Sequence, residues 1–527
     1  MAKAPQHFSA PTVVVKHKNL LTVALMLGTI MQVLDTTIAN VALPHMAASL
    51  GAAQNEITWV LTSYIVAAAI ATPLTGWMSD RIGQKRLFIL SVIGFTVASA
   101  LCGIATSLDE MVLFRLLQGL CGAMIAPLAQ TVILNINPKE RLGQAMAIYG
   151  MGIMVAPIIG PTLGGWLTES FDWRWVFLIN LPVGAATVAM LALYMPETGI
   201  KLRRFDFFGF GMLALGVGGL QLLLDRGADN DWFNSAETWI ELSVMISGFW
   251  VFVVHSLTAK TPFIDIRIFK DLNFAMASLI MFVVGIALFS GLALLPPLLQ
   301  NLMGYPVIFS SIIMAPRGAG TLVAMMIVGR LSGKVDARLM MLFGVALMGY
   351  SLYLMTGFNL QMDFWPVIYT GVIQGFGMGF IFVPLSTLAF ATIAPTFRAD
   401  ATSMFALVRN MGQGVGISVV TAVLSHMIGV NHVEIGQRLT STSWAVMNQL
   451  PILLSGNKEY LDLIDQYVQQ QGAILSYLDD FVLMMWLSIA AAPVILLLRG
   501  NKPKKGAVAP KKTQEELALE RAHAMAE

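Results

Sequence analysis

Fourteen apolar segments, each long enough to cross a lipid bilayer, dominate this chain of 527 residues. A membrane-spanning helix needs about 20 apolar residues. Because lipid offers the backbone no hydrogen-bond partners, runs of this length must be helical. Only 12% of the residues are charged, which is about half the share in soluble domains. The sequence therefore predicts an all-α integral membrane protein. The predicted spans are 20–43, 59–77, 87–106, 111–134, 144–167, 176–195, 207–224, 240–257, 274–299, 308–331, 339–357, 367–393, 402–427 and 481–498.

Basic residues are distributed unevenly between the predicted loops. When the N-terminus is placed in the cytoplasm, 25 of the 32 lysines and arginines lie in cytoplasmic loops and tails, and four lie outside. The other three, Arg115, Arg317 and Arg409, fall within predicted spans. Inside loops of membrane proteins carry an excess of Lys and Arg, and one missed span would scramble this pattern. We therefore expect an even number of spans and two cytoplasmic termini.

A degenerate internal repeat divides the chain. Segment 76–86 reads GWMSDRIGQKR, and a related segment begins at Gly329, 253 residues later. The Gln-Gly pair at 118–119 recurs at 374–375, at an offset of 256 residues. Two homologous six-span halves around two central spans explain both offsets, and such repeats are a known transporter architecture. The predicted divisions are an N-terminal tail (1–19), a six-helix bundle (20–195), two additional helices with linkers (196–271), a second six-helix bundle (272–498) with a long outside loop (428–478), and a C-terminal tail (499–527).

Several short motifs follow one another along the predicted spans. They are 34–44, 76–86, 113–122, 152–165, 173–175, 180–182, 224–227 and 408–412. The motifs at 76–86, 113–122 and 152–165 resemble signatures of the major facilitator superfamily. The others resemble the EmrB/QacA branch of fourteen-helix drug:proton antiporters, most closely its EmrB members. The resemblance implies the major facilitator fold, with two six-helix bundles plus two extra central helices, in a bacterial inner membrane.

The function that this resemblance implies is proton-driven multidrug efflux by alternating access, with lipophilic compounds as substrates and antibiotic resistance as the outcome. On the same fold the chain could instead export one metabolite, a fatty acid or a siderophore. An integral-membrane enzyme would need clustered histidines or carboxylates at one depth, and the spans contain none. We therefore expect no enzymatic activity, while an ion channel or a transport-dead sensor stays open.

Asp35 lies deep within the first predicted span. A carboxylate there costs at least about 2.5 kcal/mol unless it faces a cavity or a partner. At 1.5 Å per residue, Asp35 and Arg115 both fall roughly 10 Å below the outer surface, so they could pair. Burial favours the neutral acid and a neighbouring guanidinium favours the carboxylate, so movement of Arg115 would load or release a proton. The two residues are candidates for proton coupling, and a static ion pair that fixes helix packing stays open.

The loop at 76–86 carries the candidates for a cytoplasmic gate. These are Gly76, Asp80, Arg81, Gly83, Lys85 and Arg86. They lie too close to the surface to hold a substrate. The resemblance implies that Asp80 or Arg81 closes the loop against helix ends of the other half. Ordinary inside-loop charge with a glycine turn would explain the same residues. In the second copy Gly333 replaces the acidic residue, so we expect any gate on that side to be weaker.

The fifth predicted span contains a helix motif typical of exporters. Its residues are Gly152, Pro157, Gly160, Pro161, Gly164 and Gly165. The prolines predict a break or thinning of the helix, and small residues let neighbouring helices approach closely. Two interpretations stay open: a helix that seals one side of a transporter, or a simple packing kink.

Polar residues within spans are the candidates for a substrate cavity, because burying them without a partner costs free energy. These candidates are Gln32, Asn40, Gln118, Gln374 and Arg317. Arg317 could bind an anionic substrate group or tie broken helices together. The expected partners are lipophilic small molecules, protons and membrane lipid. A net charge of +2 gives no basic field for nucleic acid.

The outside loop at 428–478 is unusually long, and isolated loops of this length are often functional. Part of it, 459–471, has apolar residues at helical spacing. The resemblance implies that this loop works with a periplasmic adaptor and an outer-membrane channel in a tripartite pump. Packing of the loop on the outer surface stays open.

Neither a nucleotide site nor a metal site is expected. The segment that begins at Gly329 lacks the spacing and the Ser/Thr of a P-loop. Cys102 and Cys121 lie in apolar runs, and the seven histidines show no ligand spacing. We therefore expect no cofactor and a proton gradient as the energy source, since the membrane potential supplies about 2.3 kcal/mol per charge per 100 mV.

Overall fold

The computed structural model describes residues 13, 15–53, 56–201, 203–227, 232–439 and 458–499. Within these residues the chain is almost entirely helical and contains no strand. Thirteen of the described helices are long and apolar enough to cross a membrane, and the bent pair α2–α3 makes fourteen when it is counted as one span. The predicted all-α architecture is confirmed, and the spans follow one another in the predicted order.

The first bundle is built around α1, a helix of 33 residues that ends at a left-handed Gly51 with a φ of 65°, as helix C-caps often do. α1 packs on α7 and α9, and α5 packs on α2 and α4. The bundle consists of α1 (Lys18–Leu50), α2 (Trp59–Ala71), α3 (Leu74–Ile82), α4 (Gln84–Ile104), α5 (Leu108–Gly122), α6 (Ile125–Ile136), the short η1 (Lys139–Arg141), α7 (Leu142–Ser170), α8 (Trp175–Leu178) and α9 (Asn180–Tyr194).

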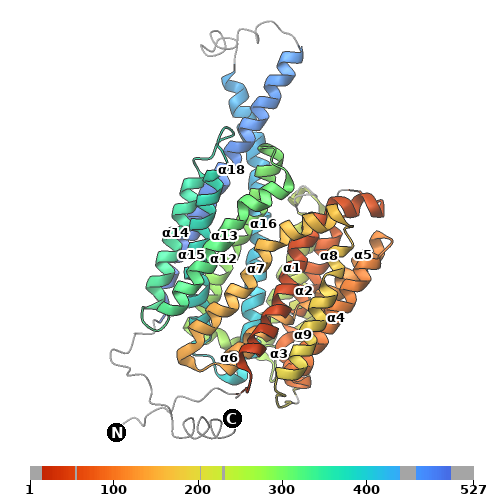
Figure 1. Cartoon of the computed structure of the whole chain (residues 1–527), viewed down its shortest axis with the longest axis vertical. Coiled ribbons are helices and arrows are strands. Elements are labelled where there is room, and N and C mark those ends of the chain that lie inside the picture. The colour runs from red at the N-terminus through yellow and green to blue at the C-terminus, as the bar shows by residue number, and fades with distance from the viewer. Residues whose placement is uncertain are drawn as a thin grey trace.

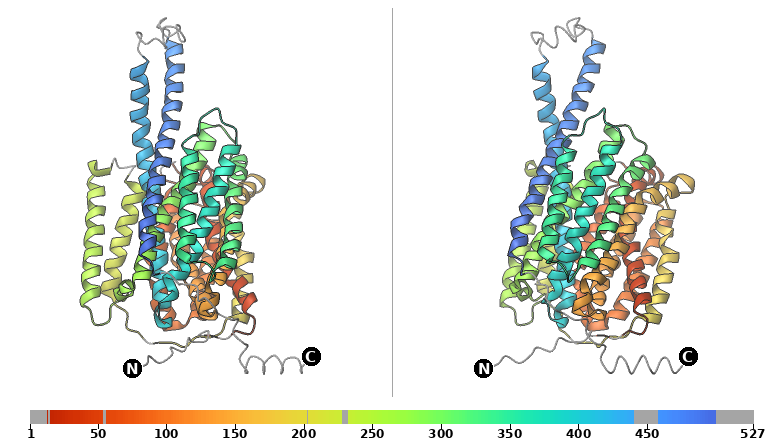
Figure 2. Two further views of the ribbon diagram at one scale, coloured as in Figure 1. Left: turned by 90° about the vertical axis from the view of Figure 1, so that its left-hand side faces the viewer. Right: turned by 60° about the vertical axis from the view of Figure 1, so that its left-hand side comes forward.

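An inserted helical pair stands on the flank of the molecule, where Figure 2 shows it in yellow-green. The inserted elements are α10 (Phe207–Arg226), η2 (Trp232–Asn234), α11 (Ala236–Thr258) and η3 (Ile266–Lys270). α10 and α11 lie close together because Gly216 and Gly248 meet without side chains between them. α10 also contacts α2 of the first bundle and α16 (Arg398–Arg438) of the second. The insertion therefore touches both halves.

The second bundle repeats the design of the first. α15 packs on α13 and α14, and α12 packs on α16. Its elements are α12 (Leu272–Pro297), a π-helical turn η4 (Leu298–Leu302), α13 (Val307–Leu331), α14 (Ala337–Met355), α15 (Trp365–Ala391), η5 (Pro395–Phe397), α16 (Arg398–Arg438) and α18 (Lys458–Leu497). The divisions proposed from the sequence at 195/196 and 271/272 fall between α9 and α10 and between η3 and α12.

Two helices project far beyond one face of the bundle. α16 has 41 residues and α18 has 40, so each is about 60 Å long, twice the roughly 30 Å thickness of a hydrocarbon core. Figures 1 and 2 show both continuing past the other helices as a hairpin. We call this side the hairpin face. The opposite side, where α1 begins and α18 ends, we call the termini face.

The segment 428–478, predicted as a loop, is helical over 428–438 and 458–478. Residues 440–457 lie outside the described part of the chain. The helix continues because apolar residues recur at helical spacing and neither stretch contains proline. Asn431 and His432 of α16 bond across the hairpin to Ser476 and Asp465 of α18, at 3.0 and 2.9 Å. The long loop predicted at 428–478 therefore contains two helical stretches, and the second includes 459–471, where the sequence has apolar residues at helical spacing.

The internal repeat recurs in the packing of the two bundles. Gly119 of α5 lies directly against the backbone carbonyl of Tyr64 in α2. Gly375 of α15 lies in the same way against the backbone carbonyl of Arg317 in α13. Tyr64 and Arg317 are 253 residues apart, and the two glycines are 256 residues apart. These are the two offsets of the sequence repeat, so the halves share this close helix crossing.

We expect Gly119→Ala and Gly375→Ala each to destabilise the protein by about 1–3 kcal/mol, because the added methyl group would overlap a backbone carbonyl that has no room to move. Thermal unfolding of the purified variants in detergent measures the loss. Gly211→Ala is the matched control: it is also helical, but its added methyl group meets nothing within 4 Å. An equal loss in all three variants would contradict the close crossings.

Candidate functional site

Asp35 lies at the centre of a buried polar network inside the first bundle. Its side chain is 1% exposed. Nη1 of Arg115 donates to Oδ2 of Asp35 at 2.6 Å, and Nε2 of Gln118 donates to Oδ1 at 2.8 Å. Nδ2 of Asn180 also donates to Oδ1, at 2.9 Å. The structure thus brings the predicted pair into contact, and three helices of one bundle, α1, α5 and α9, meet at this carboxylate.

Arg115 is held through its Nε and Nη1 by groups of the same bundle. Its Nε donates to the carbonyl of Val60 at 3.0 Å, and its Nη1 donates to Oε1 of Gln118 at 2.7 Å. The guanidinium carbon lies 4.4 Å from the ring centre of Tyr64 and 5.5 Å from that of Phe177. Arginine suits this site because its planar fork can stack on rings while it donates in several directions.

Local sequence places each member of this network. Ser107 caps α5 by accepting a hydrogen bond from the backbone N–H of Glu110 at 3.3 Å, which fixes the start of the helix that carries Arg115. Asn180 opens α9 after the short α8 and donates to Ser99 of α4 at 2.9 Å. Pro182 follows within the first turn of α9, where its missing N–H costs no helical hydrogen bond.

The chemistry available here is exchange of one proton. An ionised Asp35 accepts from three donors, whereas a protonated Asp35 would itself donate and lose its charge attraction to Arg115. In a site without water, that attraction is much stronger than at a surface. Protonation would therefore rearrange contacts between α1, α5 and α9 together.

The predicted gate loop meets the other half through an arginine from the linker before α10. Arg203 Nη1 lies 3.0 Å from Oδ2 of Asp400 in α16 and 3.8 Å from Oδ2 of Asp80. Its Nη2 also donates to the carbonyl of Phe263. Gly76 packs directly on the Asp400 side chain. The gate loop, the linker, the insertion and the second bundle are thus tied at one point of the termini face.

The remaining candidates of the gate loop stay within their own half and the linker that follows it. Arg81 lies 5.5 Å from the ring centre of Trp77. Gly83 has a φ of 86°, the left-handed conformation that the turn between α3 and α4 requires. Lys85 donates to the carbonyl of Ala192 at 2.8 Å, and the exposed Arg86 lies 3.7 Å from Glu197. Arg203 is the residue that joins Asp80 to Asp400 of the second bundle through ion pairs.

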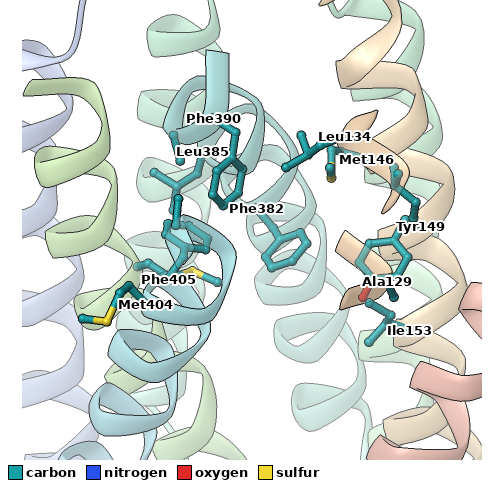
Figure 3. Packing of buried hydrophobic residues seen from close by; sticks show 14 of the residues in the cluster. Ala129, Leu134, Met146, Tyr149, Ile153, Phe382, Leu385, Phe390, Met404 and Phe405 are labelled. Atoms are coloured by element: carbon teal, nitrogen blue, oxygen red, sulfur yellow. The ribbon is translucent and has the colours of Figure 1, made fainter. Parts of the chain in front are cut away.

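Further contacts close the termini face between the two halves. Arg398 of α16 donates to the carbonyl of Leu134 at 2.8 Å, at the end of α6, and the hydroxyls of Thr131 and Thr402 lie 2.6 Å apart. Behind them, apolar side chains from both bundles join one cluster. Figure 3 shows these side chains, with α6 and α7 supplying Ala129, Leu134, Met146, Tyr149 and Ile153, and α15 and α16 supplying Phe382, Leu385, Phe390, Met404 and Phe405.

We expect Arg203→Gln to loosen the termini face, because both Asp80 and Asp400 lose their cationic partner. The measurement is the rate of disulfide formation between cysteines placed at Thr131 and Thr402, on a background without Cys102 and Cys121. This rate should fall several-fold. Arg86→Gln removes an exposed pair of small energetic value and should leave the rate unchanged. Equal rates in both variants would show that the contacts of Arg203 with Asp80 and Asp400, which we call the Arg203 lock, do not hold the termini face closed.

Comparison with known proteins decides the family. The family model described as Major Facilitator Superfamily matches residues 25–432. The chain belongs to the major facilitator superfamily. The chain is 35% identical over 495 residues to the multidrug export protein EmrB of Escherichia coli strain K12, covering 93% of this chain and 96% of that protein. It is also 35% identical over 488 residues to the fatty acid resistance protein FarB of Neisseria gonorrhoeae, covering 91% and 95%.

Solved structures agree on the fold of this major facilitator protein. The human organic anion transporter MFSD10 matches with a TM-score of 0.57 at 14% identity, covering 91% of this chain and 100% of that chain. A double-tryptophan mutant of XylE matches with a TM-score of 0.56 at 12% identity, covering 96% and 100%. The predicted major facilitator fold and EmrB-type family are confirmed, and the chain is a transporter rather than an enzyme.

The glycines of the exporter motif let α7 approach two helices of this transporter. Gly152, Gly160 and Gly164 face Met26, Thr37 and Ile38 of α1. Gly165 lies instead toward Ile308 of α13, and α7 and α13 pack extensively. α7 runs unbroken from Leu142 to Ser170 through Pro157 and Pro161. The predicted break is therefore absent, because neighbouring helices and local adjustments can satisfy the backbone groups that prolines leave free in membrane helices.

The predicted cavity residues do not gather at one place. Gln118 is fully buried and belongs to the Asp35 network, and Gln32 lies on α1 one turn from Asp35. Gln374 and Arg317, 1% and 8% exposed, lie in the second bundle on α15 and α13. Asn40 is exposed near the hairpin-face end of α1. Their assignment to a substrate cavity therefore stays a prediction.

Several functional contacts were not predicted from the sequence. Asn180 lies in the motif 180–182, which marked it only as part of a resemblance. Arg203 appeared as one of many inside basic residues, and nothing distinguished it. Asp400 lies between the predicted twelfth and thirteenth spans, where an acidic residue is ordinarily explained by its favourable interaction with the N-terminus of the following helix. A buried polar residue at a helix start, such as Asn180, was the one usable signal.

Proposed function

We propose that this protein exports lipophilic small molecules across the membrane in exchange for protons. The observation that carries the proposal is the Asp35–Arg115 pair, an ionisable group buried inside a helical bundle and held by exchangeable hydrogen bonds. Intramembrane ionisable residues of this kind mark ion and proton pathways. The names of the relatives, multidrug export protein and probable multidrug resistance protein, support drugs as the cargo.

In this proposal the protein lies in a bacterial inner membrane with its termini face in the cytoplasm. The basic residues support that orientation, because most of them belong to the loops and tails on that side. The conformation described here then has its cytoplasmic side closed by the Arg203 lock and the apolar cluster. A proton from outside binds Asp35, weakens its hold on Arg115, and lets the two bundles rock toward the opposite conformation. No cofactor takes part.

The projecting hairpin would then stand in the periplasm. Two helices that continue well past the membrane offer a surface that loops of ordinary length lack. We propose that a periplasmic adaptor and an outer-membrane channel complete a tripartite pump from this side. Co-purification of the adaptor with the full-length transporter, but not with a variant shortened across 428–478, tests this part.

One specific observation favours a narrower function. The relative FarB is described as a fatty acid resistance protein and is as similar to this chain as EmrB is. Export of fatty acids, or of another metabolite or siderophore, on the same fold is therefore the second candidate.

A susceptibility panel separates the two candidates. A strain that lacks its own exporters, complemented with this protein, should resist several unrelated lipophilic compounds, and a proton uncoupler should remove the resistance. Resistance to long-chain fatty acids alone would favour the narrower function. Efflux that continues with the uncoupler would overturn the proton-driven mechanism. The strain that carries Asp35→Asn is the control for effects of expression.

A further inference from the structure

Another acid is buried in the second bundle without a hydrogen-bond partner among the described residues. Asp480 of α18 is 0% exposed, and neither of its carboxylate oxygens has a hydrogen-bond partner among the described residues. Buried polar groups in proteins are almost always paired. An ionised carboxylate in such a place would carry the full cost of desolvation, so the group is held there as a neutral acid.

The surroundings of Asp480 are an apolar core of the second bundle. The inward stripe of α18 contains Tyr477, Phe481 and Met484, at the spacing of a buried helix face. These residues pack with leucines of α12 and η4, such as Leu298, and the ring of Phe481 lies 5.9 Å from that of Phe358. A leucine would fill this position at lower cost, so stability does not explain the acid.

The neighbouring Asp479 shows what an ordinary acid does in this region. Asp479 is exposed and accepts a hydrogen bond from Nδ2 of Asn431 at 3.3 Å. The same amide donates to Ser476 at 3.0 Å. The polar contacts of the hairpin therefore end at Asp479, and Asp480 points away from them into the core.

Charged groups of the packed helices do not neutralise Asp480. Within the described residues, α12 and η4 contain no charged side chain. In the outer half of α16, His432 pairs with Asp465 and Arg438 pairs with Glu434. The other titratable groups of the packed elements lie on α16 and α14. Those of α16 are the exposed His426 and, near its termini-face end, Arg398, Asp400 and Arg409, of which Arg398 bonds to Leu134 and Asp400 pairs with Arg203. Those of α14 are Tyr350, Tyr353 and Arg338, of which Arg338 pairs with Asp336. Asp480 interacts electrostatically with Asp479 and with Tyr477.

A positive charge, Arg317 of α13, lies near the Met484 end of this stripe. A methyl group on Gly291 of α12 would meet Arg317 Nη1 at 3.4 Å and Met484 Cε at 3.7 Å. Met484 is one helical turn from Asp480, on the side of the termini face. Arg317 has interactions of its own, and no ion pair or hydrogen bond joins it to Asp480 among the described residues.

α12, which packs on α18, has a backbone at this level that can bend. α12 ends in Pro296 and Pro297 and continues as the π-helical turn η4, which touches α18. Prolines remove backbone hydrogen bonds, and π-helical turns are frequent at functional sites. Separation of α12 from α18 at this point would admit water to the acid.

We propose that Asp480 is a second proton-binding site of this transporter, filled in the conformation seen here and emptied when α12 and α18 separate. The step is a simple exchange in which the carboxylic acid loses its proton to water and becomes a carboxylate. The inference rests on the proposed proton-driven export and adds a site in the second bundle, opposite the Asp35 network of the first.

Infrared spectroscopy of the full-length protein in lipid nanodiscs tests the bound proton directly. At neutral pH the wild-type spectrum should contain the carbonyl band of a protonated carboxyl group. Asp480→Asn and Asp480→Leu should lose that band, and the leucine variant adds no polar group that could prevent folding. Asp479→Asn is the matched control and should keep the band. Identical spectra for the wild type and both Asp480 variants would overturn the proposal.

Transport in proteoliposomes tests whether this proton moves. The number of protons exchanged per substrate molecule should fall in Asp480→Asn and stay unchanged in Asp479→Asn. An unchanged number in both would overturn the role in transport. If even the wild-type protein exports without proton exchange, the proposed function fails, and the infrared band still decides whether Asp480 holds a proton.

Discussion

Replacement of Asp35 by Asn should reduce export driven by a proton gradient to the background leak, while the protein remains folded in the membrane. Asn has nearly the shape of Asp and can still accept from Gln118 and Asn180, so the packing of α1, α5 and α9 persists even though the unpaired Arg115 lowers the stability of the protein. It lacks the titratable carboxyl group, however, and no other acidic side chain among the described residues pairs with Arg115. The measurement is substrate efflux from proteoliposomes under an imposed pH gradient.

The matched control for this loss is Asp109→Asn. Asp109 is an exposed acid in the first turn of α5, and its removal should change export little. Asp35→Glu keeps an acid on a longer side chain and should retain part of the activity. Full export by Asp35→Asn at wild-type protein levels would remove Asp35 from proton coupling and leave the static ion pair as its role.

The fold was predictable because lipid leaves a sequence few choices. Each of the fourteen predicted spans has a helix or bent helix pair at its position, since backbone groups in a bilayer must be satisfied within the segment. The repeat was visible from two short sequence matches. The crossings at Gly119 and Gly375 explain why glycine recurs there, since the backbone of the neighbouring helix passes too close to each glycine for any side chain to fit. The hairpin was missed because spans were counted by hydropathy, which ignores helix outside the membrane.

The candidate site was only partly predictable. Asp35 and Arg115 were paired by their equal depth, a one-dimensional argument that works within a membrane. Depth alone did not show that Gln118 belongs to the same network rather than to a cavity, because its direction depends on how α5 is rotated against α1. The partner of Asp80 was unpredictable for another reason: Arg203 lies in a linker, whose path no periodicity describes.

Arg115→Gln should be among the most destabilising single changes in this protein. It would leave the Asp35 carboxylate buried beside neutral groups only, and removal of one partner from a buried ion pair costs about 3–5 kcal/mol. It would also remove the bond to Val60 and the stacking on Tyr64. Thermal unfolding in detergent measures the change. Arg174→Gln, at a partly exposed pair with Asp172, should cost less than about 1 kcal/mol.

The double variant Asp35→Asn with Arg115→Gln separates charge from packing. Because no uncompensated charge remains, it should recover a substantial part of the stability lost in Arg115→Gln, although the contacts of the guanidinium are still missing. Export should stay at background, since the titratable acid is gone. Recovery of stability without recovery of transport would show that the buried charges are retained for proton exchange rather than for folding. A double variant no more stable than Arg115→Gln alone would mean that packing of the guanidinium, and not its charge, holds α1, α5 and α9 together.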